Sequence, residues 1–231
     1  MHTALRLGVR VAELIREINP ACHICFYGLY ASINAEYLLQ GLADSVVGGE
    51  YEIPLRSLIA ALDLGQAITH LEGVSTPSRI VGPNLKRPYS TRSTISHPIP
   101  SRTGLPILDK YARLEQHGTE RMVGYVEASR GCLHHCLHCP IVPVYNGRFF
   151  LVPETVVLED VRRQVQAGAT HITFGDPDFL NGPGHSLSIV RAIHAEFPHL
   201  TFDFTAKIEH LLKRRALMPD LGAQGCLFVI S

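Results

Sequence analysis

The first third of the chain alternates two hydrophobic patterns. A helical spacing is shown by the apolar residues Leu7, Val11, Leu14, Ile15 and Ile18, and Asn19-Pro20 follows them, which predicts a helix that ends there. The residues over 23–28 are mostly apolar and end in glycine, which predicts a buried strand. The same reasoning predicts a helix over 33–42, a strand over 44–49, and a helix that begins at Pro54 and has Gly65 as its C-cap. Strands separated by helices indicate a parallel sheet.

The pattern changes twice beyond residue 73. Six prolines fall between residues 77 and 106, and long apolar runs are few there, which indicates an extended surface linker over 74–118. The alternation then resumes, and we expect strands at 122–128, 170–174, 200–205 and 226–230, with helices at 153–168, 185–197 and 208–217. The sequence therefore predicts one α/β domain at 1–73 and a second at 119–231, in strict strand–helix order.

Composition narrows the class of protein. Of the 231 residues, 46% are hydrophobic and 18% are charged, which is typical of a globular chain and excludes general disorder. Lys+Arg and Asp+Glu are both 21, and this balance argues against a nucleic-acid binder that works through bulk positive charge. No apolar run approaches a membrane span, and the N-terminus lacks the features of a signal peptide. We therefore expect a cytoplasmic protein that does not bind membranes.

Three of the six cysteines lie within eight residues, at Cys132, Cys136 and Cys139. A disulfide framework needs cysteines that are spread along the chain, so this clustering favours a metal site in a reducing compartment. Three thiolates from one short loop can each bind one iron of a cubane cluster. The fourth iron then stays open for chemistry, and a small molecule with adjacent amino and carboxylate groups could chelate it. The other cysteines are expected to be core residues: Cys22, Cys25 and Cys226.

A zinc site is the alternative for the same cysteines. Cys136 and Cys139 have the spacing of a zinc-binding pair, and His134, His135 or Cys132 could complete a tetrahedron. Against zinc, no second pair follows about 12–20 residues later, as it does in many zinc motifs. Residue types and spacing leave both kinds of site open.

The spacing C-x3-C-x2-C, with the ring of His138 before the last cysteine, resembles the signature of the radical S-adenosylmethionine (SAM) superfamily. Tyr or Phe is more usual at the position of His138, which the resemblance assigns to the cofactor site. The resemblance implies that 119–231 is the N-terminal part of a (β/α) TIM-like barrel. It also implies SAM, an electron donor such as flavodoxin or ferredoxin, and a [4Fe–4S] cluster held by Cys132, Cys136 and Cys139.

Two further loops fit the same resemblance. Active-site residues of parallel barrels lie at the carboxyl ends of the strands. The loop after the second barrel strand resembles the family's GGEP motif, which binds the SAM amino group, through Gly175, Asp176, Pro177 and Asp178. After the third strand, Lys207 and Glu209 are candidates to reach the SAM ribose or carboxylate. The alternatives are an ordinary Asp-Pro turn and a solvated charged pair. Residues 145–148 look like a variable loop that leads to the first barrel helix.

Residues 5–65 resemble the cobalamin-binding domain that precedes many radical SAM barrels. The matching stretches are 26–31 (FYGLYA) and 44–50 (DSVVGGE), and the second ends in a Gly49-Glu50 step. The D-x-H-x-x-G motif that supplies a histidine ligand is absent, so cobalamin would bind without a protein histidine, or not at all. The stretch 2–50 further resembles the B12-type radical SAM proteins named for a CUAEP/CCAEP tail, although the tail itself is not in this chain.

The expected fold is α/β: a partial Rossmann-like, cobalamin-binding-like domain followed by a partial radical SAM barrel. The first domain opens on a helix where such domains open on a strand, and the barrel has four of the usual six strands, so we expect a fragment of a longer enzyme. The resemblance implies reductive cleavage of SAM to methionine and a 5′-deoxyadenosyl radical, which abstracts hydrogen from a substrate that the sequence does not identify. The alternatives are a metal-binding module without turnover and a fragment that is inactive alone.

Overall fold

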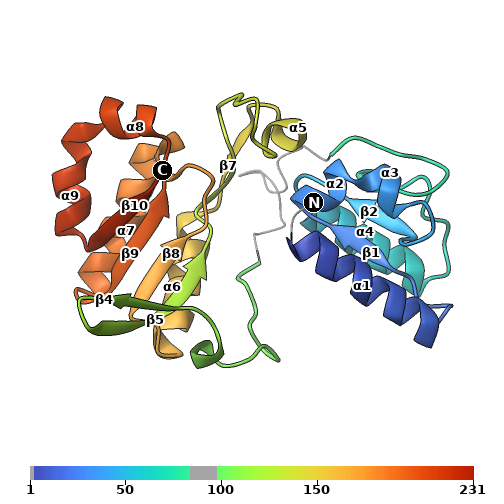
Figure 1. The fold of residues 1–231 in the computed structure, drawn as a ribbon, viewed down its shortest axis with the longest axis horizontal. Coiled ribbons are helices and arrows are strands. Elements are labelled where there is room, and N and C mark those ends of the chain that lie inside the picture. The colour runs from blue at the N-terminus through green and yellow to red at the C-terminus, as the bar shows by residue number, and fades with distance from the viewer. Residues whose placement is uncertain (1–2, 84–97) are drawn as a thin grey trace. The chain divides into compact units, whose positions relative to one another are not determined.

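The computed structural model describes residues 3–83 and 98–231, which fold into two compact units (Figure 1). The first unit comprises residues 3–83 and His134–Arg148, and the second comprises residues 98–133 and Phe149–Ser231. Each unit has its own sheet and its own hydrophobic core. The predicted division of the chain did not anticipate that His134–Arg148 packs with the first unit. Residues 84–97, within the predicted linker, lie outside the described residues.

The sheet of the first unit has three strands in the order β1-β2-β3. β1 (Cys25–Tyr27) and β2 (Ser45–Val47) are parallel, and β3 (Val74–Ser75) pairs antiparallel with β2. Val46 shares a buried cluster with α1 and α3, whereas the next residue, Val47, packs with α4, because successive side chains of a strand point to opposite faces. The helices of this unit are α1 (Thr3–Ile18), α2 (Leu29–Ile33), α3 (Ala35–Leu38), α4 (Glu52–Asp63) and α5 (Val142–Tyr145).

Two predictions for this unit were wrong in detail. The helix expected over 33–42 is instead the two short helices α2 and α3, which meet at Asn34. The Asn34 side-chain amide donates to Tyr30 O at 2.7 Å, and such local bonds compete with a continuous helix. β3 lies in the predicted linker and makes the sheet mixed rather than wholly parallel. The expectation for Gly65 is confirmed, since it follows the end of α4 with a φ of +63°.

The second unit has a five-stranded sheet in the order β10-β9-β8-β5-β4. β5, β8, β9 and β10 are parallel neighbours, as predicted, and β4 is antiparallel to β5. The strands are β4 (Arg113–Gln116), β5 (Thr119–Val126), β8 (His171–Phe174), β9 (Thr201–Thr205) and β10 (Cys226–Ile230). The helices are α6 (Glu154–Gln166), α7 (Pro183–Glu196), α8 (Ile208–Lys213) and α9 (Met218–Ala223), with 3-10 turns at Leu108–Lys110, Phe179–Asn181 and Arg215–Leu217.

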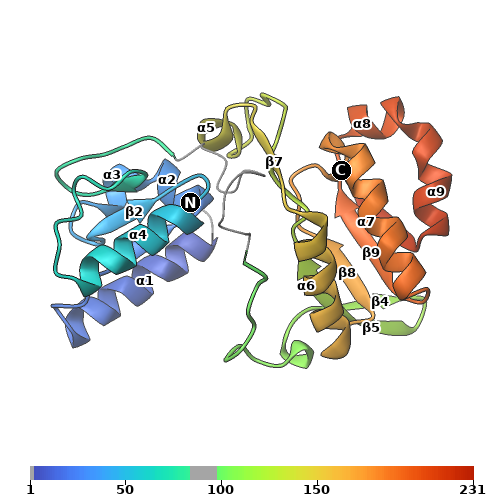
Figure 2. The ribbon, with the colours of Figure 1, turned by 180° about the vertical axis from the view of Figure 1, so that it is seen from behind.

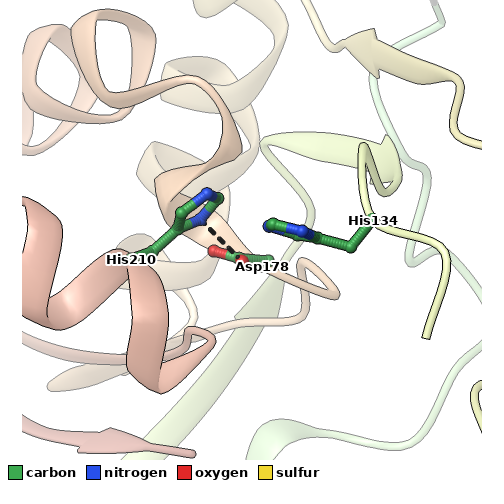
Figure 3. A group of neighbouring side chains, drawn as sticks. All are labelled: His134, Asp178 and His210. Carbon is green, nitrogen blue, oxygen red and sulfur yellow. Dashed lines mark ion pairs between the residues drawn. The ribbon is translucent and has the colours of Figure 1, made fainter.

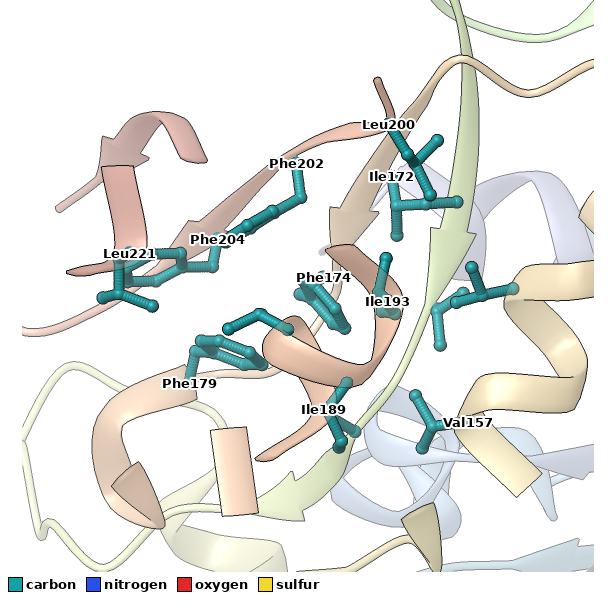
Figure 4. Close-up of a cluster of buried hydrophobic side chains, with 14 of the residues drawn as sticks. Val157, Ile172, Phe174, Phe179, Ile189, Ile193, Leu200, Phe202, Phe204 and Leu221 are labelled. Atoms are coloured by element: carbon teal, nitrogen blue, oxygen red, sulfur yellow. The ribbon is translucent and has the colours of Figure 1, made fainter. Parts of the chain in front are cut away.

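α6 and α7 cover one face of this sheet (Figure 2). The covered face holds a buried aromatic cluster (Figure 4), formed by Phe174, Phe179, Phe202 and Phe204. The ring centroids of Phe174 and Phe179 are 4.5 Å apart, and those of Phe179 and Phe204 are 5.0 Å apart, distances at which aromatic pairs attract beyond their buried area. In the described part of the chain, every helix is too short or too polar to cross a lipid bilayer.

The outer edge of β5 is protected by side chains. Tyr125 N–H donates to Gln164 Oε1 at 2.9 Å, and Gln164 Nε2 donates to Tyr125 O at 3.0 Å, so this amide replaces a neighbouring strand. Arg102 also donates to Tyr125 O, at 3.1 Å, and pairs with Asp160 of α6. The predicted linker is therefore partly wrong, because residues 98–118 supply Arg102 and β4 to the second unit and shield the edge of its sheet.

Candidate functional site

The carboxyl ends of β5, β8 and β9 lie at one edge of the sheet of the second unit, because these strands are parallel neighbours. The loop after β9 leads through Lys207 into α8, and the loop after β8 carries Gly175, Asp176, Pro177 and Asp178. Ligands of parallel α/β folds bind at this edge. The structure thus brings both loops that were predicted from the sequence to the same edge.

Asp176 ties the loop after β8 to the chain that leaves β5. The residue is 2% exposed, and its carboxylate accepts the Ala128 N–H at 2.9 Å and the Ser129 O–H. His185 of α7 contacts Ala128 as well, with Nε2 3.2 Å from the Ala128 carbonyl oxygen. Burial raises the pKa of Asp176 from 3.8 to about 7. Asp176 therefore positions the two residues that lead toward Cys132, and its contact with SAM stays a prediction.

Gly175 leaves room for the ring of Tyr125. A Cβ at position 175 would lie 1.8 Å from the Tyr125 hydroxyl oxygen, so any larger residue must displace that side chain. The hydroxyl donates to Gly175 O at 3.4 Å. Burial raises the pKa of Tyr125, and the nearby carboxylates of Glu127 and Asp176 raise it further, which keeps the hydroxyl protonated. Pro177 is half-buried between the two aspartates of the loop.

Asp178 forms a buried pair with His210 (Figure 3). His210 Nδ1 lies 2.8 Å from Asp178 Oδ2, and the two side chains are 9% and 2% exposed. The other carboxylate oxygen accepts the Leu180 N–H at 3.0 Å and caps the 3-10 turn that follows. Sequence reasoning missed His210, although its position one turn after Lys207 in a predicted helix could have indicated an inward-facing polar residue.

Lys207 and Glu209 face solvent at the same edge. Lys207 Nζ lies 2.8 Å from Glu209 Oε2, and the two side chains are 38% and 55% exposed. The backbone N–H of Lys207 donates to Asp178 Oδ2 at 3.4 Å, which connects the loops after β8 and β9. An exposed pair of this kind is weakly stabilising. The geometry is that of a solvated charged pair, and contact of either residue with SAM stays a prediction.

The cysteine segment follows a short ribbon that the sequence analysis did not predict. β6 (Ser129–Gly131) pairs antiparallel with β7 (Phe149–Leu151), and Gly131 has a φ of +74°, a conformation that favours glycine. Cys132, Cys136 and Cys139 are half-buried and form no disulfide. The Cys139 N–H donates to Cys136 O at 3.1 Å, and His138 is exposed within this turn. Three free thiols in one segment are a donor set that fits an iron–sulfur cluster.

A polar network lies on the sheet face opposite α6 and α7, and it too was missed. His171 Nε2 is 2.7 Å from Asp203 Oδ1, and the Thr173 hydroxyl donates to the same oxygen at 2.6 Å. His171 Nδ1 is 2.8 Å from Thr201 Oγ1. Burial and the nearby Asp203 charge raise the pKa of Cys226 to about 11, so this cysteine remains a protonated thiol.

Glycines form the carboxyl edge of the first unit. Gly28 follows β1 and Gly49 follows β2, with φ values of +94° and +71°. A Cβ on Gly48 would lie 2.3 Å from the Ser32 hydroxyl oxygen, so α2 approaches this backbone closely. Glu50 comes next and is 1% exposed. Glycines at the carboxyl ends of parallel strands allow a ligand to approach the backbone.

The fold of the chain matches solved enzymes at low sequence identity. The radical SAM methyltransferase TsrM from Kitasatospora setae, with tryptophan substrate and the SAM analog aza-SAM bound, has a TM-score of 0.73 at 18% identity and covers 95% of this chain and 42% of its own. TsrM with cobalamin and a [4Fe–4S] cluster bound has a TM-score of 0.67 at 18% identity, over 96% and 44%. Apo OxsB, a cobalamin-dependent SAM radical enzyme, has a TM-score of 0.59 at 18% identity, over 96% and 33%.

Comparison by sequence gives a shorter match. No protein-family model matches the chain. The tRNA-2-methylthio-N(6)-dimethylallyladenosine synthase of Chlorobium chlorochromatii (strain CaD3) is 35% identical over 65 residues, which are 28% of this chain and 14% of that protein. The chain spans less than half the length of each of these proteins. The predicted α/β fold class is confirmed, and over nearly its whole length the chain has the fold of the radical SAM enzymes TsrM and OxsB.

Proposed function

We propose that the chain is part of a radical SAM enzyme whose [4Fe–4S] cluster is held by Cys132, Cys136 and Cys139. The observation that carries this proposal is the C-x3-C-x2-C run of free thiols just after the first of four parallel strands. The fold shared with TsrM and OxsB supports it. When bound, such a cluster supplies the electron that splits SAM into methionine and a 5′-deoxyadenosyl radical.

The residues of the chain bind and orient the cofactor in this proposal. The loop over 175–178 receives the SAM amino group, because it follows β8 at the carboxyl edge, where ligands of parallel α/β folds bind. Lys207 and Glu209 give up their solvent-exposed pairing to reach the SAM carboxylate and ribose. His138 lies beside the last cysteine and contacts the cofactor with its ring. A flavodoxin- or ferredoxin-type protein is the reductant.

Asp176 has a second task in the same proposal. Its carboxylate holds the backbone of Ala128 and the hydroxyl of Ser129, three residues before Cys132. The loop that receives SAM and the start of the cysteine segment are therefore joined by one buried side chain. Preorganisation of this kind lowers the cost of bringing two cofactors together.

Cluster binding can be tested by anaerobic reconstitution of the chain with iron and sulfide. We expect about four irons per chain, broad visible absorbance, and formation of 5′-deoxyadenosine from SAM after chemical reduction. Cys136→Ala should lose the absorbance and the SAM cleavage. Cys226→Ala is the matched control, because this half-buried thiol lies outside the motif and has a raised pKa. Stoichiometric zinc with no visible absorbance would contradict the proposal and support the zinc module.

We further propose that the first unit binds cobalamin without a histidine ligand. The support is the glycine-lined edge of its parallel strands together with the fold that the chain shares with cobalamin-bound TsrM. Cobalamin would allow methyl transfer to an unactivated carbon. The test is a titration with hydroxocobalamin, followed by absorbance. Gly49→Val should weaken binding at least about tenfold, whereas Gly118→Val, at a glycine of similar φ in the other unit, should not. Lack of binding by the wild-type chain would remove cobalamin from the proposal and leave the cluster intact.

A further inference from the structure

A buried hydrogen bond joins two parts of the first unit that are 95 residues apart in the sequence. The Tyr145 hydroxyl donates to Glu50 Oε1 at 3.1 Å. Glu50 is 1% exposed and Tyr145 is 8% exposed. Burial of a carboxylate is unfavourable unless hydrogen bonds compensate for the lost water. The contact therefore holds both residues in place more firmly than a surface contact would.

Short-range backbone hydrogen bonds stabilise the segment between Cys136 and Tyr145. The Cys139 N–H donates to Cys136 O at 3.1 Å, and the Val142 N–H donates to Cys139 O at 3.3 Å. The Tyr145 N–H then donates to Ile141 O at 2.8 Å at the end of α5. Movement of Tyr145 away from Glu50 would thus disturb the turn that carries Cys136 and Cys139.

The ends of the same segment are also packed against each other. Gly147 has a φ of +72°, and a Cβ at this position would lie 2.4 Å from Nε2 of His135. The imidazole of His135 therefore occupies the space that a side chain at position 147 would need. Residues 135–147 form a segment whose two ends lie close together, and α5, within this segment, contacts α2 of the same unit. Because the two ends of this segment are packed together, we expect its anchor on Glu50 to affect both Cys136 and Cys139.

Glu50 lies at the carboxyl edge of the sheet of the first unit. It follows Gly48 and Gly49, directly after the carboxyl end of β2. The carboxyl ends of parallel strands are the ligand-binding edge of doubly wound domains. A residue here is in a position to link the state of that edge to the cysteine segment.

We propose that Glu50 and Tyr145 are positioning residues that fix Cys136 and Cys139 on the first unit. The placement of the thiols is a property of the chain alone, and only the identity of the metal group rests on the proposed function. Loss of the Tyr145 hydroxyl lets the segment open, which exposes the thiols and makes the cluster more labile. Residues 145–148, which the sequence suggested to be a variable loop, thereby acquire a specific role.

The first test uses the cluster-free chain and follows the alkylation of each cysteine by iodoacetamide with mass spectrometry. Tyr145→Phe should raise the rates of Cys136 and Cys139 roughly tenfold, because a buried acceptor left without its donor shifts an opening equilibrium by this order. Cys22 and Cys25, which lie elsewhere in the same unit, serve as internal references. Tyr37→Phe is the matched control, since this tyrosine of α3 is 44% exposed. Unchanged rates at Cys136 and Cys139 would overturn the proposal.

Glu50→Gln keeps an acceptor oxygen for Tyr145 and should stay close to the wild-type rates. This conservative variant separates a specific hydrogen bond from general loosening, provided that both variants retain the circular dichroism of the wild type. If Tyr145→Phe did not fold, Glu50→Ala would replace it, with the same rise expected at the two cysteines. Accelerated alkylation of all cysteines alike, in either variant, counts against a positioning role.

The second test measures the loss of iron from the reconstituted chain to a chelator. Tyr145→Phe should release iron several-fold faster than the wild type and Tyr37→Phe, at equal initial iron content. Failure of the wild type to bind iron would refute the proposed function, and the alkylation rates would still decide the role of Tyr145. Equal iron release by wild type and Tyr145→Phe, with equal alkylation, would refute the positioning role and leave the proposed function standing.

Discussion

The carboxyl edges of the two sheets are built in opposite ways. In the second unit, buried side chains tie the loops together, as Asp176 holds Ala128 and Asp178 pairs with His210. In the first unit, glycines at positions 28, 48 and 49 follow the strands, so the backbone at this edge carries few side chains. Parallel strands can thus form a carboxyl edge in two ways: buried polar contacts fix the loops, or glycines expose the backbone. The edge of the second unit is stabilised by a few buried hydrogen bonds. The edge of the first unit depends on backbone conformations that only glycine adopts easily.

The largest expected effect is that of Asp178→Ala. This change leaves His210 buried without its carboxylate and removes the cap of the 3-10 turn at Phe179–Asn181. A buried imidazole left without its acceptor costs about 1–3 kcal/mol in the free energy of unfolding, and loss of the cap adds about 1 kcal/mol. Urea denaturation of the chain measures it. Asp220→Ala is the control, since Asp220 pairs with Arg191 at the surface, where the cost should stay below about 1 kcal/mol. Equal effects of the two variants would refute the contrast between buried and exposed pairs.

The next effect is the pH dependence that Asp176 gives to stability. Its pKa is about 7 in the folded chain, above the ordinary 3.8 that it regains on unfolding. Between these values the folded state retains a proton that the unfolded state has lost, so this contribution to stability falls as the pH rises from about 4 to about 7. Asp176→Asn stays neutral and can still accept from Ala128 and donate to Ser129. Relative to wild type, the variant should gain up to a few kcal/mol between pH 5 and pH 8 in urea denaturation.

A constant difference between Asp176→Asn and wild type over this pH range would show that Asp176 titrates normally. In that case the loops at the carboxyl edge of the second unit would not be held by a carboxylate whose pKa is raised by burial. Asp63→Asn at the end of α4, in the other unit, serves as the comparison for a general effect of removing one carboxylate.

A smaller effect is expected at the glycine edge. Gly49 has a φ of +71°, and a side chain in this left-handed conformation costs about 1–2 kcal/mol. Gly49→Ala should therefore lower the free energy of unfolding by this amount. Gly184→Ala is the opposite control, because Gly184 lies within α7 with open space around it, and alanine favours helix there. If Gly49→Ala left the free energy of unfolding unchanged, the carboxyl edge of the first unit would not depend on glycine conformations.

The smallest effect on stability is expected for Lys207→Met. The pair of Lys207 with Glu209 is solvent-exposed, so its loss should cost less than about 1 kcal/mol. The same change should weaken SAM binding to the reconstituted chain roughly tenfold, since it removes one charged contact. Isothermal titration calorimetry measures the affinity, and Lys213→Met, at the last position of α8, is the control. An unchanged affinity for SAM would indicate that Lys207 and Glu209 form a solvated charged pair and do not bind SAM.

The elements that the sequence predicted best are those with long, regular patterns. The helix predicted to end at Asn19-Pro20 is α1, although its buried residues are Leu5, Val9 and Ala12 and the predicted apolar residues from Leu7 to Ile18 are exposed. The segments 170–174, 200–205 and 226–230 are the parallel strands β8, β9 and β10. β8 and β9 alternate polar and apolar residues, since successive side chains of a strand point to opposite faces, whereas β10 is a continuous apolar run. β4 and β6 were missed because their residues are mostly polar, whereas β1, β2 and β8 are equally short but apolar enough to be predicted. β7 was missed as well.

The candidate site shows the same division. The cysteine spacing and the Gly-Asp-Pro-Asp loop were visible because their residues are close together in the sequence. His210, Tyr145 and Gln164 were missed because their partners lie 32, 95 and 39 residues away in the sequence: Asp178, Glu50 and Tyr125. Apart from the helical position of His210, nothing in the local pattern of these residues distinguishes them from surface polar residues, and burial reveals that each needs a partner.

The sequence by itself determined the α/β alternation, the parallel direction of the main strands of the second sheet and the cysteine spacing, because each depends on residues within one or two elements. Tertiary structure alone decided that residues 98–118 complete the second unit, that Asp176 is buried with a raised pKa, and that the segment with Cys136 and Cys139 packs on the first unit. The physical reason is that burial and hydrogen-bond partners are set by contacts between distant segments. Those contacts are selected by packing and by the need to satisfy buried polar groups, which no local pattern encodes.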